Sequence, residues 1–97
     1  MKILALEQEV PGVEAAQFTL ELVKAEARRA WELHLQGVIR ALYFREERTM
    51  AVLELECEDA DAARAVLATL PLVAEGLITF EVIALRTYPG FERLFEA

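Results

Sequence analysis

Apolar and polar positions along the chain follow two different periods. Two segments, Thr19 to Gly37 and Asp59 to Leu70, repeat their apolar residues every three to four positions, as amphipathic helices do. Four other segments are short and rich in strand-forming residues, and these are Lys2–Glu9, Val38–Arg45, Met50–Cys57 and Leu77–Arg86. The resulting order, strand-helix-strand-strand-helix-strand, predicts a ferredoxin-like α+β domain over residues 1–97. Its four-stranded antiparallel sheet would carry both helices on one face.

Residues that favour helix ends and turns support these bounds of the helices and strands. Thr19 and Asp59 are good N-caps for the two helices, and Gly37 suits the end of the first. Only the short charged link 46–49 separates the second and third strands, which predicts a hairpin. The chain shows no repeat or linker, so we expect one domain.

Alternation assigns faces to the last two strands. In the third strand, Ala51, Leu53, Leu55 and Cys57 share a face that suits packing on the helices, which leaves Glu54 and Glu56 on the other. In the fourth strand both faces are apolar, and one of them consists of Leu77, Thr79, Glu81, Ile83 and Leu85. Alternation does not phase the first two strands. We expect the Glu81 face to point away from the helices.

A sheet face without helices needs another cover. If that face holds about eight large apolar side chains, leaving it in water forfeits on the order of 10–20 kcal/mol. The total stability of a domain is typically only about 5–15 kcal/mol. Because the sequence offers no third helix, we expect a second copy of the sheet to cover the face. This predicts a homodimer, in which two sheets form an α+β barrel with the helices outside.

The amino-acid composition excludes some classes of binding partner and of catalytic residue. The formal net charge of −7 and a pI near 4.7 disfavour binding to nucleic-acid phosphates. No apolar run is long enough to span a membrane, and the first residues do not resemble a signal peptide, so we expect a cytoplasmic protein without membrane contact. The sequence contains no Ser, which excludes a serine nucleophile, and no Asn, which fits a heat-adapted source. Cys57 is the only cysteine and is expected to be inert.

The C-terminal tail carries an unusual number of large apolar side chains. Phe91, Leu94 and Phe95 follow helical spacing within the last residues, where chain ends usually fray. We expect the tail, residues 88–97, to contact a neighbouring subunit, although packing on its own chain is the alternative.

Several short motifs resemble those of the muconolactone isomerases. They are Gly37-x-x-Arg40-x-Leu42-Tyr43, Leu70-Pro71-Leu72 and Glu81-Val82-x-x-Leu85-x-x-Tyr88-Pro89. The resemblance covers roughly residues 20 to 90. It implies a dimeric α+β barrel, which in that family assembles further into rings of dimers, and an isomerase that moves a proton on a small unsaturated ring. At Tyr88 the family carries His instead.

Three residues are candidates for that proton transfer. Glu81 lies mid-strand on the face assigned to the barrel, where burial would raise its pKa, and Glu54 shares that face. Arg40 is a candidate for binding an anionic carboxylate. Ordinary structural roles compete with each assignment: Glu81 and Arg40 would suit interface ion pairs, and Glu54 would suit an exposed edge.

Three further residues are candidate substrate contacts. His34, the only histidine, lies in the apolar stripe of the first helix, and a core histidine is its alternative reading. Tyr43 and Tyr88 would line the pocket or simply pack. We expect no metal and no cofactor, because one His without a nearby acidic partner makes a poor metal site. The competing functions are a non-catalytic ligand-binding or assembly protein and a cofactor-free monooxygenase.

Overall fold

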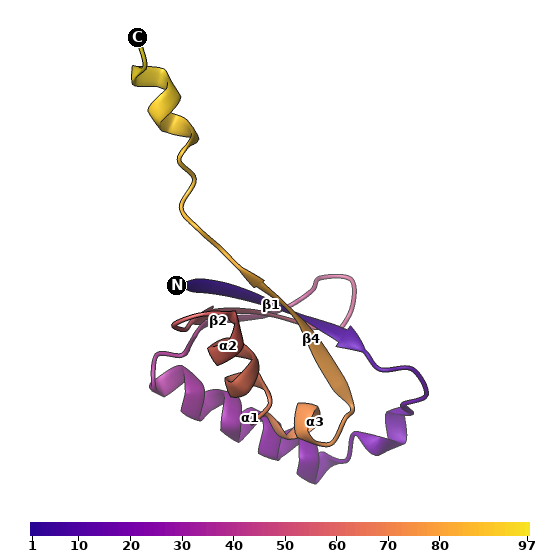
Figure 1. The fold of residues 1–97 in the computed structure, drawn as a ribbon. Helices are drawn as coiled ribbons and strands as arrows, with labels where there is room; N and C mark the ends of the chain where they lie inside the picture. The colour runs from indigo at the N-terminus through magenta and orange to yellow at the C-terminus, as the bar shows by residue number, and fades with distance from the viewer.

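The computed structural model describes residues 1–97, and its four strands form one antiparallel sheet with the helices on a single face (Figure 1). The strand order is β2-β3-β1-β4, so the two strands at the chain's ends lie next to each other. The strands are β1 (Lys2–Glu9), β2 (Ile39–Phe44), β3 (Ala51–Glu56) and β4 (Ile78–Ala84), and the longer helices are α1 (Leu20–Leu35) and α2 (Ala60–Leu67). The predicted ferredoxin-like arrangement is confirmed. No helix is long and apolar enough to cross a membrane.

The helices begin and end at the residues that their sequence preferences indicate. The Thr19 hydroxyl accepts a hydrogen bond from the Leu22 N–H at 3.2 Å, and the Asp59 carboxylate accepts one from the Ala62 N–H at 2.7 Å. After α1 the backbone turns through Gly37, whose φ of 78° is costly for any residue with a Cβ.

The cap at Asp59 gives a testable stability contribution. We expect Asp59→Ala to lower the free energy of unfolding by about 1 kcal/mol, because the Ala62 N–H loses its side-chain acceptor at the start of α2. Urea titration measures the change. Asp59→Asn keeps an acceptor at the same position and should retain most of the stability; an equal loss in both variants would contradict the capping explanation.

One short helix was not predicted. Helix α3 (Pro71–Ala74) follows Leu70 directly and has proline at its first position, where the missing N–H costs nothing. It packs against α1, far away in the sequence. As a result, the backbone N–H of Leu72 is brought beside the middle of α1.

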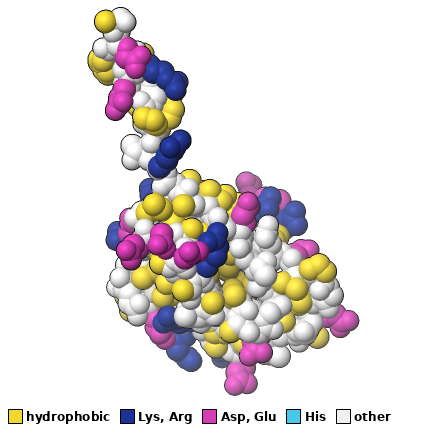
Figure 2. Space-filling view, viewed as in Figure 1, with side chains coloured by type: hydrophobic (Ala, Val, Ile, Leu, Met, Phe, Trp, Pro, Cys, Tyr) yellow, Lys and Arg dark blue, Asp and Glu magenta, His cyan; other side chains and the backbone are white.

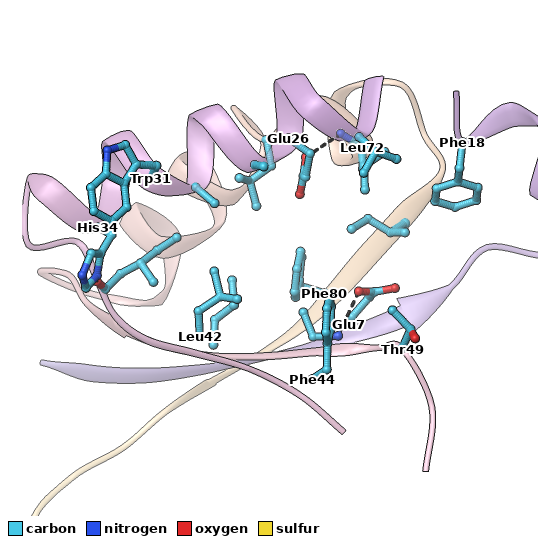
Figure 3. A pocket seen from close by; sticks show the side chains of 18 residues that line it. Glu7, Phe18, Glu26, Trp31, His34, Leu42, Phe44, Thr49, Leu72 and Phe80 are labelled. Atoms are coloured by element: carbon cyan, nitrogen blue, oxygen red, sulfur yellow. Dashed lines mark hydrogen bonds between the residues drawn. The ribbon is translucent and has the colours of Figure 1, made fainter. Parts of the chain in front are cut away.

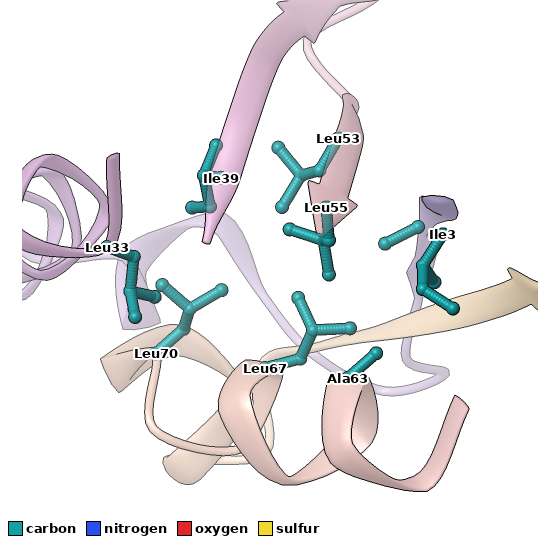
Figure 4. Packing of buried hydrophobic residues seen from close by; sticks show 9 residues of the cluster. Ile3, Leu33, Ile39, Leu53, Leu55, Ala63, Leu67 and Leu70 are labelled. Atoms are coloured by element: carbon teal, nitrogen blue, oxygen red, sulfur yellow. The ribbon is translucent and has the colours of Figure 1, made fainter. Parts of the chain in front are cut away.

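The hydrophobic core lies between the helices and the sheet (Figure 4). Alternation along β1 turns Ile3 and Ala5 toward the helices, and both are fully buried. Glu7, two residues further on, follows the same alternation toward the helix-covered face. The nine buried residues of the cluster are Ile3, Ala5, Leu33, Ile39, Leu53, Leu55, Ala63, Leu67 and Leu70.

A β-bulge explains why alternation could not phase β2. Ile39 pairs with Leu55, but Ala41 pairs with Glu54, so Arg40 is the extra residue between two consecutive pairs. The bulge reverses the alternation, and as a result Ile39 and Leu42 both reach the helix-covered side.

The other sheet face has no helix over it. Leu4, Leu6, Val52 and Ile83 lie there side by side, because β1 pairs Leu4 with Ile83 and Leu6 with Val52. All four are only half-buried. This is the face for which the sequence predicts a partner's sheet.

Beyond β4 the chain leaves the body as an arm, residues 85–97, which ends in a 3₁₀ turn at Gly90–Phe95 (Figures 1 and 2). The longest dimension of the molecule is 61 Å because of this extension. Phe91, Leu94 and Phe95 are 70%, 77% and 87% exposed. Near the start of the arm, the Tyr88 ring meets Phe91 edge-on at 5.1 Å. The apolar groups of the arm therefore contact little of their own chain.

Candidate functional site

A cavity of about 660 Å³ lies between α1 and the helix-covered face of the sheet (Figure 3). Its size falls in the range of small-molecule sites. Of the eighteen lining residues, fourteen are hydrophobic, so water inside it has few hydrogen-bonding partners. The four polar ones are Glu7, Glu26, His34 and Thr49.

Helix α1 forms one wall and the sheet the other. The apolar stripe of the helix turns Val23, Ala27, Ala30 and Trp31 toward the cavity. Strand residues such as Leu42, Phe44 and Phe80 lie opposite, and Phe18 and Leu72 lie toward one end (Figure 3).

Glu26 extends from α1 into this apolar space (Figure 3). One of its carboxylate oxygens accepts a hydrogen bond from the Leu72 N–H of α3 at 2.9 Å. Burial raises the pKa of the Glu26 carboxyl above its usual 4.5, the hydrogen bond from Leu72 opposes that rise, and the charge of Glu7 adds to it. The net effect is a carboxyl group that holds its proton more tightly than an exposed glutamate does.

Glu7 enters the same cavity from the sheet. One of its oxygens accepts a hydrogen bond from the Ala51 N–H of β3 at 2.9 Å, which fixes the side chain toward α1 (Figure 3). The two carboxylates therefore project from opposite walls into one space, and the electrostatic effect of Glu7 on Glu26 follows from this arrangement.

The far end of the cavity holds an imidazole. The Nδ1 atom of His34 lies 3.0 Å from the carbonyl oxygen of Ile39, and since a carbonyl only accepts, Nδ1 carries the proton. In the neutral ring Nε2 then carries the lone pair. The Trp31 ring lies 5.7 Å from the imidazole, and Trp31 is 60% exposed at the cavity rim.

Of the six residues that the sequence proposed for the site, His34 alone lines this cavity. Glu81 and Glu54 lie on the opposite sheet face, beside Leu6 and Leu4, and Glu54 is paired with Lys2 at 2.9 Å. Their catalytic role stays a prediction for a site on that face.

The remaining three proposed residues also lie elsewhere. Arg40, at the bulge, donates from Nε to the carbonyl oxygen of Gly37. Tyr43 pairs with Val52 and is exposed, and Tyr88 belongs to the arm. A role for them in substrate binding stays a prediction that requires a second copy of the chain.

Sequence reasoning missed Glu7 and Glu26, although a signal was present. Glu26 interrupts the apolar stripe of α1, three residues after Val23 and four before Ala30. Glu7 continues the inward alternation of Ile3 and Ala5. A carboxylate at a position that the periodicity assigns to the interior is the informative feature.

The raised pKa of Glu26 makes stability depend on pH. The folded pKa of Glu26 exceeds the unfolded value of about 4.5. The contribution of Glu26 to the free energy of unfolding is therefore fully present below that pH, and it is lost as the pH rises through the folded pKa. The Glu26→Gln variant has no carboxyl group to ionise at this position, so it does not undergo this loss of stability at higher pH. We therefore expect the melting temperature of the variant to exceed that of the native chain by more at about pH 7 than at about pH 4, measured by calorimetry. An advantage that shrinks with rising pH would show that Glu26 is not destabilised by burial.

Comparison with known proteins assigns the sequence to a family. The family model of muconolactone delta-isomerase matches residues 4–90, which is most of the chain. Among curated proteins, no match is found.

Two solved structures have the same fold. A muconolactone isomerase is 22% identical, with a TM-score of 0.73 over 92% of both chains. A 5-chloro-2-hydroxyhydroquinone dehydrochlorinase from Burkholderia phenoliruptrix AC1100, in complex with 2,5-dihydroxybenzoquinone, is 17% identical, with a TM-score of 0.69 over 93% of this chain and 98% of that one. The family model covers all three α-helices, most of β1 and the other three strands, and the chain therefore belongs to the muconolactone delta-isomerase family.

Proposed function

We propose that the cavity between α1 and the sheet is an active site in which a small unsaturated ring compound is isomerised by proton transfer. The observation that carries this proposal is the pair of carboxylates, Glu7 and Glu26, which project into an otherwise apolar cavity from opposite walls.

Glu26 is the proposed proton carrier. Moving a double bond next to a carbonyl requires a base that removes a proton from one carbon and returns it to another. A carboxylate with a raised pKa suits both steps, since it accepts the proton more readily than an exposed glutamate and still gives it back. The bond from Leu72 holds one oxygen, which leaves the other to face the ring.

The surroundings of Glu26 support the same assignment. Glu7, held by the Ala51 N–H, contributes the negative charge that favours the protonated form of Glu26. Thr49 supplies a hydroxyl that can donate a hydrogen bond to developing charge on a carbonyl oxygen. The mainly apolar lining places few other hydrogen-bonding groups around these two carboxylates.

The two related structures support a reaction of this kind on a ring. One is named as an isomerase, and the other as a dehydrochlorinase of a hydroxylated ring. Both named reactions act on the hydrogen and the double bonds of a small ring, which a positioned carboxylate can promote.

Hydrogen exchange tests the proposal without knowledge of the natural substrate. The protein is incubated in D₂O with a panel of unsaturated lactones and cyclic enones, and loss of ring C–H signals is followed by NMR. We expect catalysed exchange at the carbon next to the carbonyl for at least one ring. Binding of rings without any exchange above the buffer rate would favour a ligand-binding protein instead.

A further inference from the structure

Helix α3 depends on another helix for one of its first hydrogen bonds. Its first residue, Pro71, has no N–H, and the N–H of Val73 bonds to the carbonyl oxygen of Leu70 at 3.0 Å. No side chain at the N-cap of α3 accepts a hydrogen bond, so the N–H of Leu72 would stay unpaired in the isolated segment. Glu26 of α1 accepts that bond at 2.9 Å, as the dashed line in Figure 3 shows. The carboxylate and the start of α3 therefore hold each other in place.

A second polar contact joins the same two parts of the chain. The Nε of Arg29 donates to the hydroxyl oxygen of Thr69 at 3.0 Å, and that hydroxyl donates to the carbonyl oxygen of Val66, near the end of α2, at 2.6 Å. Arg29 lies three residues after Glu26 in α1. Thr69 lies three residues before Leu72. The two contacts are thus in register between segments that run in opposite directions.

Arg29 is itself held in one orientation. Its terminal NH1 group pairs with Glu32, one turn further along α1, at 3.1 Å, and its side chain is 29% exposed. A planar guanidinium that is held at one end presents Nε in a constant direction. Leu70 lies between the two contacts, is only 2% exposed and lines the cavity. The segment that both contacts hold therefore forms part of the cavity wall.

We propose that Arg29 is a positioning residue for Glu26: by binding the Thr69 hydroxyl it fixes the segment that leads into α3, and so keeps the Leu72 N–H on the Glu26 carboxylate. The inference rests on the proposed function only in taking Glu26 as the proton carrier. A base that moves a proton between two carbons needs its reacting oxygen in a constant position. The bond from Leu72 provides this only while α3 stays packed against α1.

A loss of this alignment has a defined electrostatic effect at Glu26. Burial raises the pKa of the Glu26 carboxyl, and the hydrogen bond from Leu72 opposes that rise. A weaker bond therefore leaves the pKa of Glu26 higher still, and a rate that needs the ionised carboxylate then rises only at higher pH. Glu7 is the charged group that faces Glu26 from the sheet, and α3 carries no titratable side chain.

Two variants of Thr69 test the contact without changing any charge. Thr69→Val removes the hydroxyl, and Thr69→Ser keeps it. NMR on the full chain measures the protection of the Leu72 amide against exchange with D₂O, and the pKa of Glu26 from its carboxyl carbon. In Thr69→Val we expect the protection to fall by roughly three- to tenfold, the range for loss of one hydrogen bond, and the pKa of Glu26 to rise. Thr69→Ser should match the native chain in both quantities. An unchanged Leu72 amide together with an unchanged pKa in Thr69→Val overturns the inference.

A double variant tests whether Arg29 acts through Thr69. Arg29→Gln alone should lower the protection of the Leu72 amide about as much as Thr69→Val does, and the two changes together should add little to either one. Arg28→Gln removes the same charge from an exposed neighbouring position and should leave the Leu72 amide as in the native chain. Additive losses in the double variant would show that the two residues act independently, which overturns the inference.

The NMR measurements do not require turnover, so this inference and the proposed function fail separately. With a ring that exchanges hydrogen, the pH profile of the rate in Thr69→Val should be displaced to higher pH, and Thr69→Ser should restore the native profile. A rate that falls equally at every pH indicates a merely structural loss and overturns the positioning role. If no ring exchanges hydrogen, the proposed function fails, while the Leu72 amide and the pKa of Glu26 still decide whether Arg29 positions this carboxylate.

Discussion

Replacing Glu26 by Gln lowers the rate of hydrogen exchange on the ring by about 10²–10⁴-fold, the range expected for loss of a general acid-base group. Gln has nearly the same shape as Glu, and its side-chain oxygen can still accept the hydrogen bond from Leu72. It cannot take up a proton from carbon. The effect should therefore appear in the maximal rate more than in the affinity for the ring.

The folded state of this variant gives an internal check. Because burial raises the pKa of Glu26, removal of its charge should leave the protein at least as stable at neutral pH. A loss of activity together with an unchanged or higher melting temperature assigns the effect to chemistry rather than to unfolding.

Two further variants make the comparison specific. Glu21→Gln makes the same chemical change on the exposed face of α1 and should keep the native rate. Glu81→Gln tests the residue that the sequence proposed as the base, which lies on the opposite sheet face. Native activity in Glu26→Gln, or a large loss in Glu81→Gln alone, would move the proposed base from the cavity to the open face.

Removal of residues 88–97, the outer part of the arm, should lower the mass of the assembly in solution by about half or more, if the arm joins neighbouring subunits. The reason is the exposure of Phe91, Leu94 and Phe95, which face solvent on a segment that stands away from its own body (Figure 1). We propose that a second copy of the chain covers them. Light scattering coupled to size exclusion measures the mass directly.

A full-length variant separates side-chain burial from chain length. With Phe91, Leu94 and Phe95 all replaced by Ser, the mass should fall as it does on deletion, because the apolar contacts are lost. Glu92→Gln with Arg93→Gln keeps those contacts and should retain the native mass. An unchanged mass after deletion would show that the arm does not hold subunits together.

The open sheet face supplies a second reason to expect self-association. Leu4, Leu6, Val52 and Ile83 form a half-buried apolar group there, and full burial of each is worth roughly 1.5–3 kcal/mol. The proposed homodimer would bury this group between two sheets, and it would bring Glu54 and Glu81 into the interior with them. These glutamates then need partners, and Lys2 already provides one for Glu54.

Local sequence patterns predicted the helices and strands well, because each pattern is caused by interactions between residues that are close together in the sequence. Thr19 and Asp59 cap the helices through bonds that span three residues, and alternation placed Leu53 and Leu55 in the core. The pattern failed at β2, where one extra residue at Arg40 reversed the alternation. A bulge depends on pairing with β3, and no local periodicity reports it.

The site was less predictable than the fold. The sequence selected Glu81 because it interrupts an apolar strand, but the same reasoning applied to α1 and β1 would have identified Glu26 and Glu7. His34 was found because it lies on the apolar stripe of α1. The importance of Glu26 rests on Leu72, which is 46 positions away in the sequence and was not assigned to a helix.

The sequence by itself determined the order of elements, the ends of both long helices, the inward face of β3 and the family to which the chain belongs. These features follow from short-range hydrogen bonding, side-chain periodicity and the spacing of short motifs along the chain. Only the tertiary structure decided which sheet face meets the helices in β1 and β2, and which carboxylates share a cavity. Both depend on strand pairing and helix docking, which bring Glu7, Glu26 and Leu72 together from distant positions.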